Sequence, residues 1–186
     1  MLVTNVPEYY EKGKLLRSHG MTSLSYERSK GHSTAYDVIE LGFNYRIDDI
    51  HSAIALVQIE KLKEDINRRV EIRERYLNNF GSDEKIIVPF RNNREFVSNY
   101  IFPIVLKEST VQKRDMVRNQ LHEAGIQTSV HYPAAHRFSI YKQYGGSLEK
   151  TEYVTDNEIT LPMYSKLTGA QVDYITGLVK KFAENG

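Results

Sequence analysis

The sequence predicts an α/β chain in which a long helix is followed by a small α/β domain with a short, mainly antiparallel sheet. Two observations lead to this fold class. Between Asp48 and Phe80, apolar residues recur every three or four positions, which is the period of an amphipathic helix. Beyond that segment, short runs rich in isoleucine, valine and phenylalanine alternate with stretches that begin at capping boxes, which is typical of an α/β domain.

The first 47 residues show little regular periodicity. The opening "MLVT" is predicted as a short strand, and we expect its partner strand to lie upstream. "PEYYEKGKLLRSHG" is predicted as a helix, with Pro7 in its first turn and Gly20 at its end. Residues 21–40 are polar and have no period, which indicates a long loop.

One continuous helix is predicted for residues 48–80. Asp48 suits its N-cap, because a carboxylate accepts hydrogen bonds from the free amides of the first turn. About 30 residues at 1.5 Å each make a rod of roughly 45 Å, so we expect the helix to link two bodies. Its early stretch "IHSAIALVQI" is apolar on most sides, which predicts burial. The expected buried stripe consists of Ile59, Leu62, Ile66, Val70, Leu77 and Phe80.

Residues 81–186 are predicted to form the small domain. Strands are expected at "KIIVPF", "NYIFPIVL", "IQTSV" and "TLPMY". Helices are expected at "STVQKRDMVRNQLHEAG", with a capping box from Ser109 to Gln112, and at "SLEKTEYVTDNEI". The last helix, "TGAQVDYITGLVKKFAENG", begins with a second capping box, from Thr168 to Gln171. Its expected buried stripe is Val172, Ile175, Val179 and Phe182.

The composition argues against several functional classes. The chain has 25 basic and 24 acidic side chains, whereas a dedicated nucleic-acid binder normally has a basic excess. Without cysteine, disulfides and cysteine zinc sites are excluded. No apolar run approaches the ~20 residues of a membrane span, and the N-terminus lacks the order of a signal peptide. We therefore expect a cytoplasmic protein that binds neither nucleic acid nor a membrane.

The histidines and carboxylates are not spaced like a known catalytic or metal site. His131 and His136 lie five positions apart, but no third ligand is placed to complete a zinc site, so no metal is expected. Two interpretations stay open: a polar loop shaped by Pro133, or a loop in which His131, directly after a strand, faces a ligand. Nucleophile elbows and glycine-rich phosphate loops are missing, and Asp48 and Asp49 are expected to be solvated.

The stretch "GFNYR" at 42–46 is the candidate for anion binding. The amide of Asn44 and the planar guanidinium of Arg46 both suit a phosphate or carboxylate, and the following helix adds backbone amides and the positive end of its dipole. The alternative is that Arg46 pairs with Asp48 or Asp49 and that Asn44 only shapes the turn.

Five stretches together resemble the sugar aminotransferases of the DegT/DnrJ/StrS type, which are fold-type I enzymes that use pyridoxal phosphate. They are "MLVTN", "LLRSHGM", "ELGFNYRIDDIHSAIALVQIEKLKEDINRRVEIRERY", "GIQTSVHYPAAH" and "ITLPMYSKLTGAQV". The resemblance covers only the C-terminal half of such an enzyme. It implies a remnant of the large cofactor domain at 1–47, a linking helix at 48–80 and a small C-terminal domain at 81–186.

The resemblance also implies roles for individual residues. Asn44 would reach across a dimer interface to the phosphate of the neighbouring subunit's cofactor, with Arg46 as support. His131 and Tyr132 match a loop beside the nucleotide-sugar substrate. Tyr26, in a segment that varies among such enzymes, is a further substrate-binding candidate.

The implied reaction of the intact enzyme moves an amino group, usually from glutamate, to a nucleotide-linked keto sugar in polysaccharide or amino-sugar biosynthesis. The lysine that forms the Schiff base would lie upstream, so the resemblance implies no catalytic residue in this chain, and we expect the chain alone to be inactive. It would associate with the missing cofactor domain or form a homodimer. The alternative is a non-catalytic dimerisation or regulatory module derived from the same fold.

Overall fold

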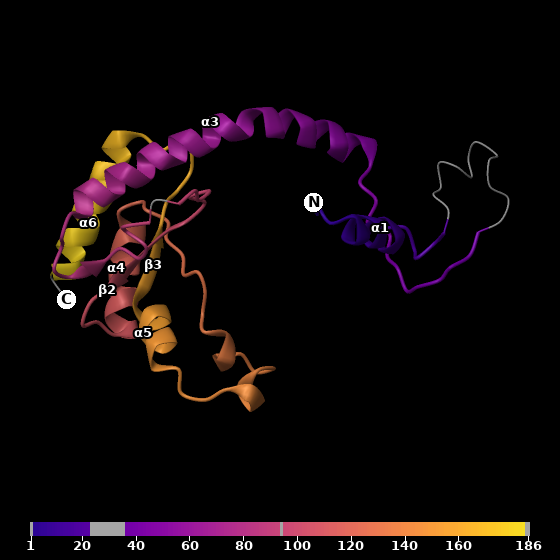
Figure 1. Cartoon of the computed structure of the whole chain (residues 1–186). Coiled ribbons are helices and arrows are strands. Elements are labelled where there is room, and N and C mark those ends of the chain that lie inside the picture. The colour runs from indigo at the N-terminus through magenta and orange to yellow at the C-terminus, as the bar shows by residue number, and fades with distance from the viewer. Residues whose placement is uncertain (1, 23–35, 94, 185–186) are drawn as a thin grey trace. The chain divides into compact units, whose positions relative to one another are not determined.

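The computed structural model describes residues 2–22, 36–93 and 95–184. The chain divides into two compact units, Met1–Glu60 and Lys61–Gly186. Helix α3 (Asp49–Phe80) is continuous over 32 residues and contributes to both units (Figure 1), so the prediction of one long helix is confirmed. In the first unit, α3 is preceded by helix α1 (Pro7–Leu16), which Pro7 begins as predicted.

The second unit contains a three-stranded antiparallel sheet in the order β1–β2–β3. Its strands are β1 (Ile86–Ile87), β2 (Phe102–Leu106) and β3 (Glu158–Leu161). The α/β class with a short antiparallel sheet is thus confirmed. The strands are shorter than expected, and "IQTSV" contributes only an isolated bridge between Ser129 and Thr160.

The pleat of β3 separates two kinds of side chain. Ile159 and Leu161 lie on one face, where Ile159 is opposite Ile104 of β2, and all three are buried in the hydrophobic core. Glu158 and Thr160 alternate with them and lie on the other face, yet they are also buried. A buried carboxylate and hydroxyl need hydrogen-bond partners, and theirs come from the segment around His131.

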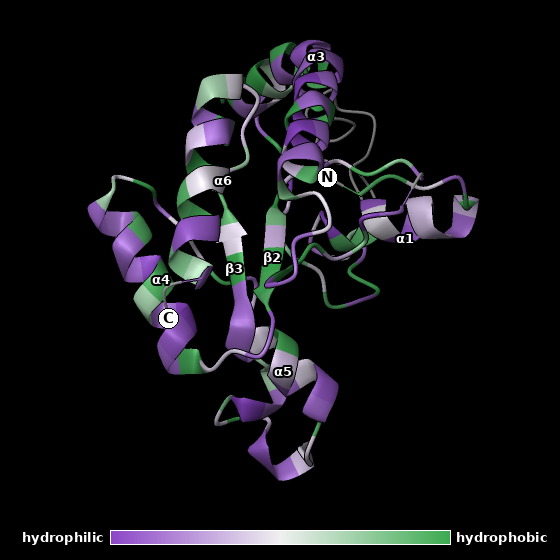
Figure 2. Cartoon of the chain, turned by 90° about the vertical axis from the view of Figure 1, so that its left-hand side faces the viewer, coloured by the Kyte–Doolittle hydropathy of each residue, from purple (hydrophilic) through white to green (hydrophobic). Residues whose placement is uncertain are grey.

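In the described chain, three α-helices of the second unit follow α3. They are α4 (Val111–Glu123), α5 (Glu149–Asn157) and α6 (Gly169–Glu184), with short 3-10 turns at Ala135–Arg137 and Lys142–Tyr144. Helices α4 and α6 lie side by side next to β2 and β3 (Figure 2). The core is formed by α3, α4, α6 and one face of the sheet.

The capping predictions are mostly confirmed. At α6, the amide of Thr168 donates to Gln171 Oε1 at 2.9 Å and the amide of Gln171 donates to Thr168 Oγ1 at 3.3 Å, which is a capping box. At α4, the cap is Thr110 rather than Ser109, because Thr110 Oγ1 accepts from the amide of Lys113 at 3.2 Å. The helix therefore begins one residue later than predicted.

Helix α3 is fastened to α6 by a polar cluster. The guanidinium of Arg75 donates to both carboxylate oxygens of Asp173, at 2.8 and 2.5 Å, and Asn79 Nδ2 donates to the same carboxylate at 2.8 Å. The hydrogen bond from Arg75, followed by that from Asn79, lowers the pKa of Asp173 to about 2. Beside this cluster, the buried Tyr76 donates its hydroxyl to the carbonyl of Pro162 at 3.0 Å.

Two segments whose predicted partner lies upstream have no partner within the described residues. Residues 2–4 form no strand, since none of the described segments pairs with them. The apolar residues early in α3 are exposed rather than buried: Leu56 is 67% and Ile54 is 56% exposed. Of the predicted α3 stripe, Leu77 and Phe80 are buried, whereas Ile59, Leu62 and Val70 are exposed and Ile66 is half-buried. Among the described helices, none has the length and apolar character needed to cross a membrane.

Candidate functional site

The segment that contains Asn44 is held by backbone pairing with the residues that follow α1. The amide of Phe43 donates to the carbonyl of Leu16 at 2.7 Å, and the amide of Tyr45 donates to that of Arg17 at 3.0 Å. In the opposite direction, the amide of His19 donates to the carbonyl of Phe43 at 2.9 Å. These bonds bring two segments of the resemblance, "LLRSHGM" and "ELGFNYR", side by side.

Two glycines make this close pairing possible. Gly20 has a φ of +70°, and a Cβ at this position would lie 1.9 Å from the carbonyl oxygen of Glu40. A Cβ at Gly42 would lie 2.1 Å from the amide nitrogen of Gly20. Any side chain at Gly42 would therefore push the two backbones apart.

Arg46 orients the amide of Asn44. Asn44 Oδ1 accepts from Arg46 Nε at 3.2 Å, and within the described residues Asn44 Nδ2 has no hydrogen-bond partner. The alternative from sequence is not found, since no ion pair joins Arg46 to Asp48 or Asp49 in the described structure. His19 Nε2 lies 3.5 Å from Arg46 Nη2, which adds a third polar side chain that sequence reasoning missed.

Asp48 caps α3 as predicted. Its Oδ1 accepts from the amide of His51 at 2.8 Å and its Oδ2 lies 2.7 Å from His51 Nδ1. The backbone amide of His51, followed by its imidazole, lowers the pKa of Asp48. The expectation of free amides at this helix start is therefore only partly met, because the carboxylate already occupies the amide of His51. Next to this helix start, Asn44 Nδ2 is a side-chain donor without a partner among the described residues.

His131 is half-buried and lies in the second unit, within a chain of partly buried hydrogen bonds. His131 Nδ1 is 2.9 Å from Thr160 Oγ1 and 3.2 Å from Ser129 Oγ. The backbone amide of His131 donates to Glu158 Oε2 at 3.0 Å, while Thr160 Oγ1 donates to Glu158 Oε1. Sequence reasoning singled out His131 but missed Glu158 and Thr160, whose only signal was a polar residue at every second position of a buried strand.

A cavity of about 740 Å³ opens next to His131. Its wall includes Tyr100, Tyr164, Tyr174 and Gln171, with apolar residues between them. Cavities of this size and mixed character commonly bind small molecules. His131 is one of the residues that line this cavity, as expected if its loop faces a ligand.

Tyr132 is exposed and lies at the edge of the same site. Its ring meets that of His131 edge-on, with 4.8 Å between ring centroids. A hydrogen bond with the hydroxyl of Tyr100, which lines the cavity, raises the pKa of Tyr132. The neutral phenol of Tyr132 is thereby favoured beside the cavity.

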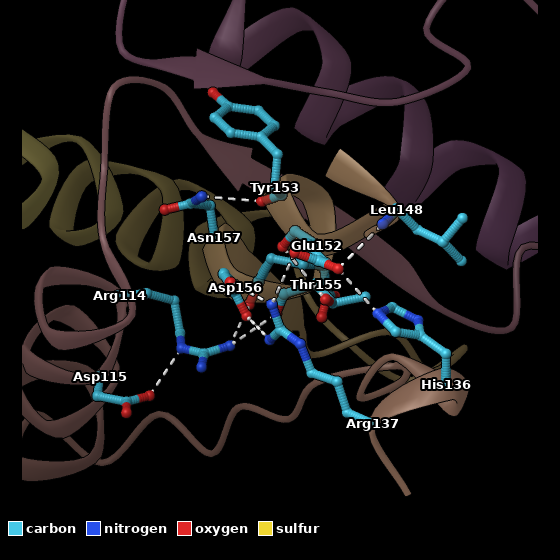
Figure 3. A network of polar contacts seen from close by, with 11 residues as sticks. Arg114, Asp115, His136, Arg137, Leu148, Glu152, Tyr153, Thr155, Asp156 and Asn157 are labelled. Atoms are coloured by element: carbon cyan, nitrogen blue, oxygen red, sulfur yellow. Dashed lines mark hydrogen bonds and ion pairs between the residues drawn. The ribbon is translucent and has the colours of Figure 1, made fainter. Parts of the chain in front are cut away.

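The loop after Tyr132 is anchored to α5 by a polar network (Figure 3). Glu152 Oε1 accepts from His136 Nε2 and from the amide of Leu148, both at 3.0 Å. Arg137 pairs with both carboxylate oxygens of Asp156. The amide of Leu148, followed by the imidazole of His136, lowers the pKa of Glu152. His136 thus fastens the loop and does not join His131 at one site.

The remaining predicted residue, Tyr26, lies outside the described residues. Within the described parts of the chain, no group of three or more histidine, aspartate or glutamate side chains is placed to hold a metal ion.

A comparison with family models decides what these sites belong to. Residues 1–180 match the DegT/DnrJ/EryC1/StrS aminotransferase family. The chain belongs to this family. The resemblance drawn from the sequence motifs is therefore confirmed, and it extends over nearly the whole chain.

Curated relatives in the family include UDP-4-amino-4,6-dideoxy-N-acetyl-beta-L-altrosamine transaminases. The chain is 31% identical to that of Campylobacter jejuni (serotype O:23/36) over 89% of its own length and 43% of the relative, and 29% identical to that of Helicobacter pylori over 99% and 48%. An uncharacterized protein of Methanocaldococcus jannaschii, MJ1066, is 31% identical over 97% of the chain and 48% of the relative. The chain thus spans about half the length of the curated relatives it matches.

Solved structures agree with this assignment. Helicobacter pylori PseC, an aminotransferase involved in the biosynthesis of pseudoaminic acid, superposes with a TM-score of 0.87 at 28% identity, covering 99% of this chain and 48% of that one. The PLP form of the putative sugar aminotransferase Spr1654 from Streptococcus pneumoniae gives 0.83 at 26% identity, covering 98% and 45%. A PMP form of Spr1654 matches too, so pyridoxal phosphate is the cofactor of this family.

The residues of the first unit fit part of this cofactor. A phosphate group accepts hydrogen bonds, and Asn44 Nδ2 is a donor without a partner in the described structure. Arg46 adds positive charge and keeps the acceptor oxygen of Asn44 turned toward itself. The amide donor of Asn44 and the positive charge of Arg46 are therefore of the kind that a phosphate group requires.

Proposed function

We propose that this chain supplies the C-terminal portion of a pyridoxal-phosphate-dependent aminotransferase, which acts in the cytoplasm on a nucleotide-linked keto sugar with glutamate as amino donor. The observation that carries the proposal is the family match over residues 1–180, together with the relatives that are UDP-sugar transaminases. When bound, the cofactor supplies the electron sink for amino transfer. The product would be an amino sugar for polysaccharide or related biosynthesis.

In this proposal, Asn44 donates from Nδ2 to the cofactor phosphate of the neighbouring subunit in a homodimer. Arg46 keeps the amide in this orientation through its bond to Oδ1. His131 and Tyr132 contact the substrate beside the cavity, and Tyr26 is a further substrate contact. The residues of this chain bind and orient, whereas the lysine that links the cofactor covalently belongs to a segment outside it.

The lack of buried apolar side chains in the described part of the first unit supports the proposal that further polypeptide packs against it. Among its described residues only Ser18 and Gly20 are buried, and no apolar side chain is. A unit with no buried apolar side chain gains little hydrophobic stabilisation by itself. We therefore propose that residues 1–47 are the remnant of a larger cofactor domain, that 48–80 link it to the small domain at 81–186, and that the missing domain covers the exposed apolar surface.

Reconstitution tests the proposal. The purified chain is mixed with pyridoxal phosphate, treated with borohydride and mapped by mass spectrometry, alone and together with the N-terminal portion of the Campylobacter jejuni relative. We expect a covalent adduct only on the added portion, and amino transfer only in the mixture. A specific adduct on a lysine of this chain that supports amino transfer alone would refute the proposal.

Variants of Asn44 make the test specific. In the active mixture, Asn44→Asp should weaken cofactor binding strongly, because a carboxylate faces the phosphate, and Asn44→Ala should weaken it less. The matched control is Asn78→Asp, an exposed position on α3 in the second unit. If the mixture forms a stable dimer without amino transfer for any nucleotide sugar, the alternative of a dimerisation or regulatory module is favoured.

A further inference from the structure

The environment of His131 determines which of its ring nitrogens carries the proton. Glu158 is only 3% exposed and Thr160 only 5% exposed. Water therefore has little access to replace the hydrogen bonds between these two side chains. Both carboxylate oxygens of Glu158 accept hydrogen bonds, one from the backbone amide of His131 and one from the hydroxyl of Thr160. The hydroxyl of Thr160 has a single hydrogen, and this hydrogen is committed to Glu158.

The oxygen of Thr160 can then act only as an acceptor toward His131. Nδ1 lies 2.9 Å from this oxygen, a distance at which two lone pairs would repel each other. A proton on Nδ1 turns the contact into a hydrogen bond from the ring to Thr160 Oγ1. Ser129 Oγ, at 3.2 Å, is the more distant of the two hydroxyls and retains a rotatable hydrogen, so it adapts to either state.

We infer that Glu158 and Thr160 are positioning residues that hold neutral His131 in the form protonated on Nδ1, with an unprotonated Nε2 for a ligand in the adjoining cavity. The backbone pairing of Ser129 with Thr160, with N–O distances of 3.2 and 2.8 Å, keeps the arrangement in place. Nε2 has no partner among the described residues and His131 lines the cavity, so Nε2 is the nitrogen available to a ligand.

This state specifies the chemistry of the ligand group that meets His131. A neutral imidazole with a free lone pair on Nε2 accepts a hydrogen bond, so its partner is a donor such as a hydroxyl of a sugar. The assignment of that hydroxyl to the substrate rests on the proposed function. The protonation state itself follows from the contacts within this chain and is measured without substrate.

The experiment is nitrogen NMR of the full chain, at a pH at which the spectra show the ring to be neutral. Long-range proton–nitrogen correlations distinguish a protonated from an unprotonated ring nitrogen. The chain has six histidines, and the signals of His131 are those lost in His131→Asn. We expect the protonated type at Nδ1 and the unprotonated type at Nε2. The opposite assignment in the unsubstituted chain overturns the inference without recourse to any variant.

Glu158→Gln provides the sharpest variant, because it keeps the shape and changes the direction of one hydrogen bond. With the amide oxygen accepting from the backbone of His131, its NH₂ group faces Thr160 and donates to Oγ1. The hydroxyl of Thr160 is then released and donates to Nδ1, so the proton of the neutral ring should move to Nε2. Retention of the proton on Nδ1 in a folded Glu158→Gln chain counts against the inference.

Two substitutions separate positioning from simple packing. Thr160→Val should abolish the preference for Nδ1, giving a mixture of both forms, since the oxygen that accepts from Nδ1 is removed. Ser129→Ala is the matched control and should leave the proton on Nδ1. The reverse result, with Ser129→Ala changing the form and Thr160→Val leaving it intact, would assign the role to Ser129 and overturn the inference. Backbone amide spectra confirm that each variant is folded.

Discussion

Replacing Gly42 with alanine should detach the segment of Asn44 from the residues that follow α1. The new Cβ would lie 2.1 Å from the amide nitrogen of Gly20 and 2.5 Å from the carbonyl carbon of His19. Real Cβ atoms essentially never come within 3.0 Å of such atoms, and because both are backbone atoms, no side-chain rotation relieves the overlap. The two backbones must therefore separate by about 1 Å, which breaks hydrogen bonds that depend on close approach.

The cost of this separation follows from the three backbone hydrogen bonds between the segments, whose lengths are 2.7, 2.9 and 3.0 Å. At about 1 kcal/mol for each bond, their loss costs roughly 3 kcal/mol of local stability. The first unit buries no apolar side chain among its described residues, so it has little other stabilisation to offset this loss. We expect the pairing to be lost while the second unit stays folded.

Amide hydrogen exchange measures this outcome. In Gly42→Ala the amides of His19, Phe43 and Tyr45 should exchange at the rate of an unstructured chain, while those of β2 and β3 keep their protection. The control is Gly146→Ala, since a Cβ at Gly146 meets nothing within 4 Å. Unchanged protection of the three amides in Gly42→Ala would show that the close approach of the two backbones is not the reason for the glycine.

Three further predictions concern stability and association. Tyr76→Phe should lower the free energy of unfolding by about 1 kcal/mol in urea denaturation, because the carbonyl of Pro162 loses its donor; an unchanged midpoint would contradict this. Carbon NMR should show the carboxyl of Asp173 titrating with a pKa of about 2. Because this pKa in the folded state lies below the ordinary value, the ionised carboxylate stabilises the fold fully near neutral pH. This stabilisation is lost as the pH falls toward 2. Asn79→Ala should raise that midpoint, and a midpoint that does not move would contradict the role of the amide. Leu56→Lys should increase the monomer fraction of the isolated chain in light scattering, whereas Gln58→Lys, the same change of charge on the same helix, should not; equal effects would indicate that charge rather than apolar contact controls association.

The sequence was sufficient for features whose causes are local. The continuity of α3, the cap at Asp48 and the capping box at Thr168 were all predicted, because each depends on residues within a turn or two of one another. The family followed from motifs in order along the chain, and the family match over residues 1–180 confirmed it. Asn44 was also singled out from its neighbours alone, although its role stays a proposal.

Tertiary structure decided the features that join residues far apart in the chain. Position 42 requires glycine because the backbone of Gly20 lies too close for a Cβ. The environment of His131 depends on Glu158, which is 27 positions away. The periodicity of the sequence predicts neither contact. Which residues meet is fixed by the pairing of distant backbone segments, and the sequence does not show directly which segments pair. The same holds for the exposed residues early in α3. Their apolar character predicted burial, but burial also requires a surface to pack against, and only the three-dimensional arrangement shows where the described chain provides one.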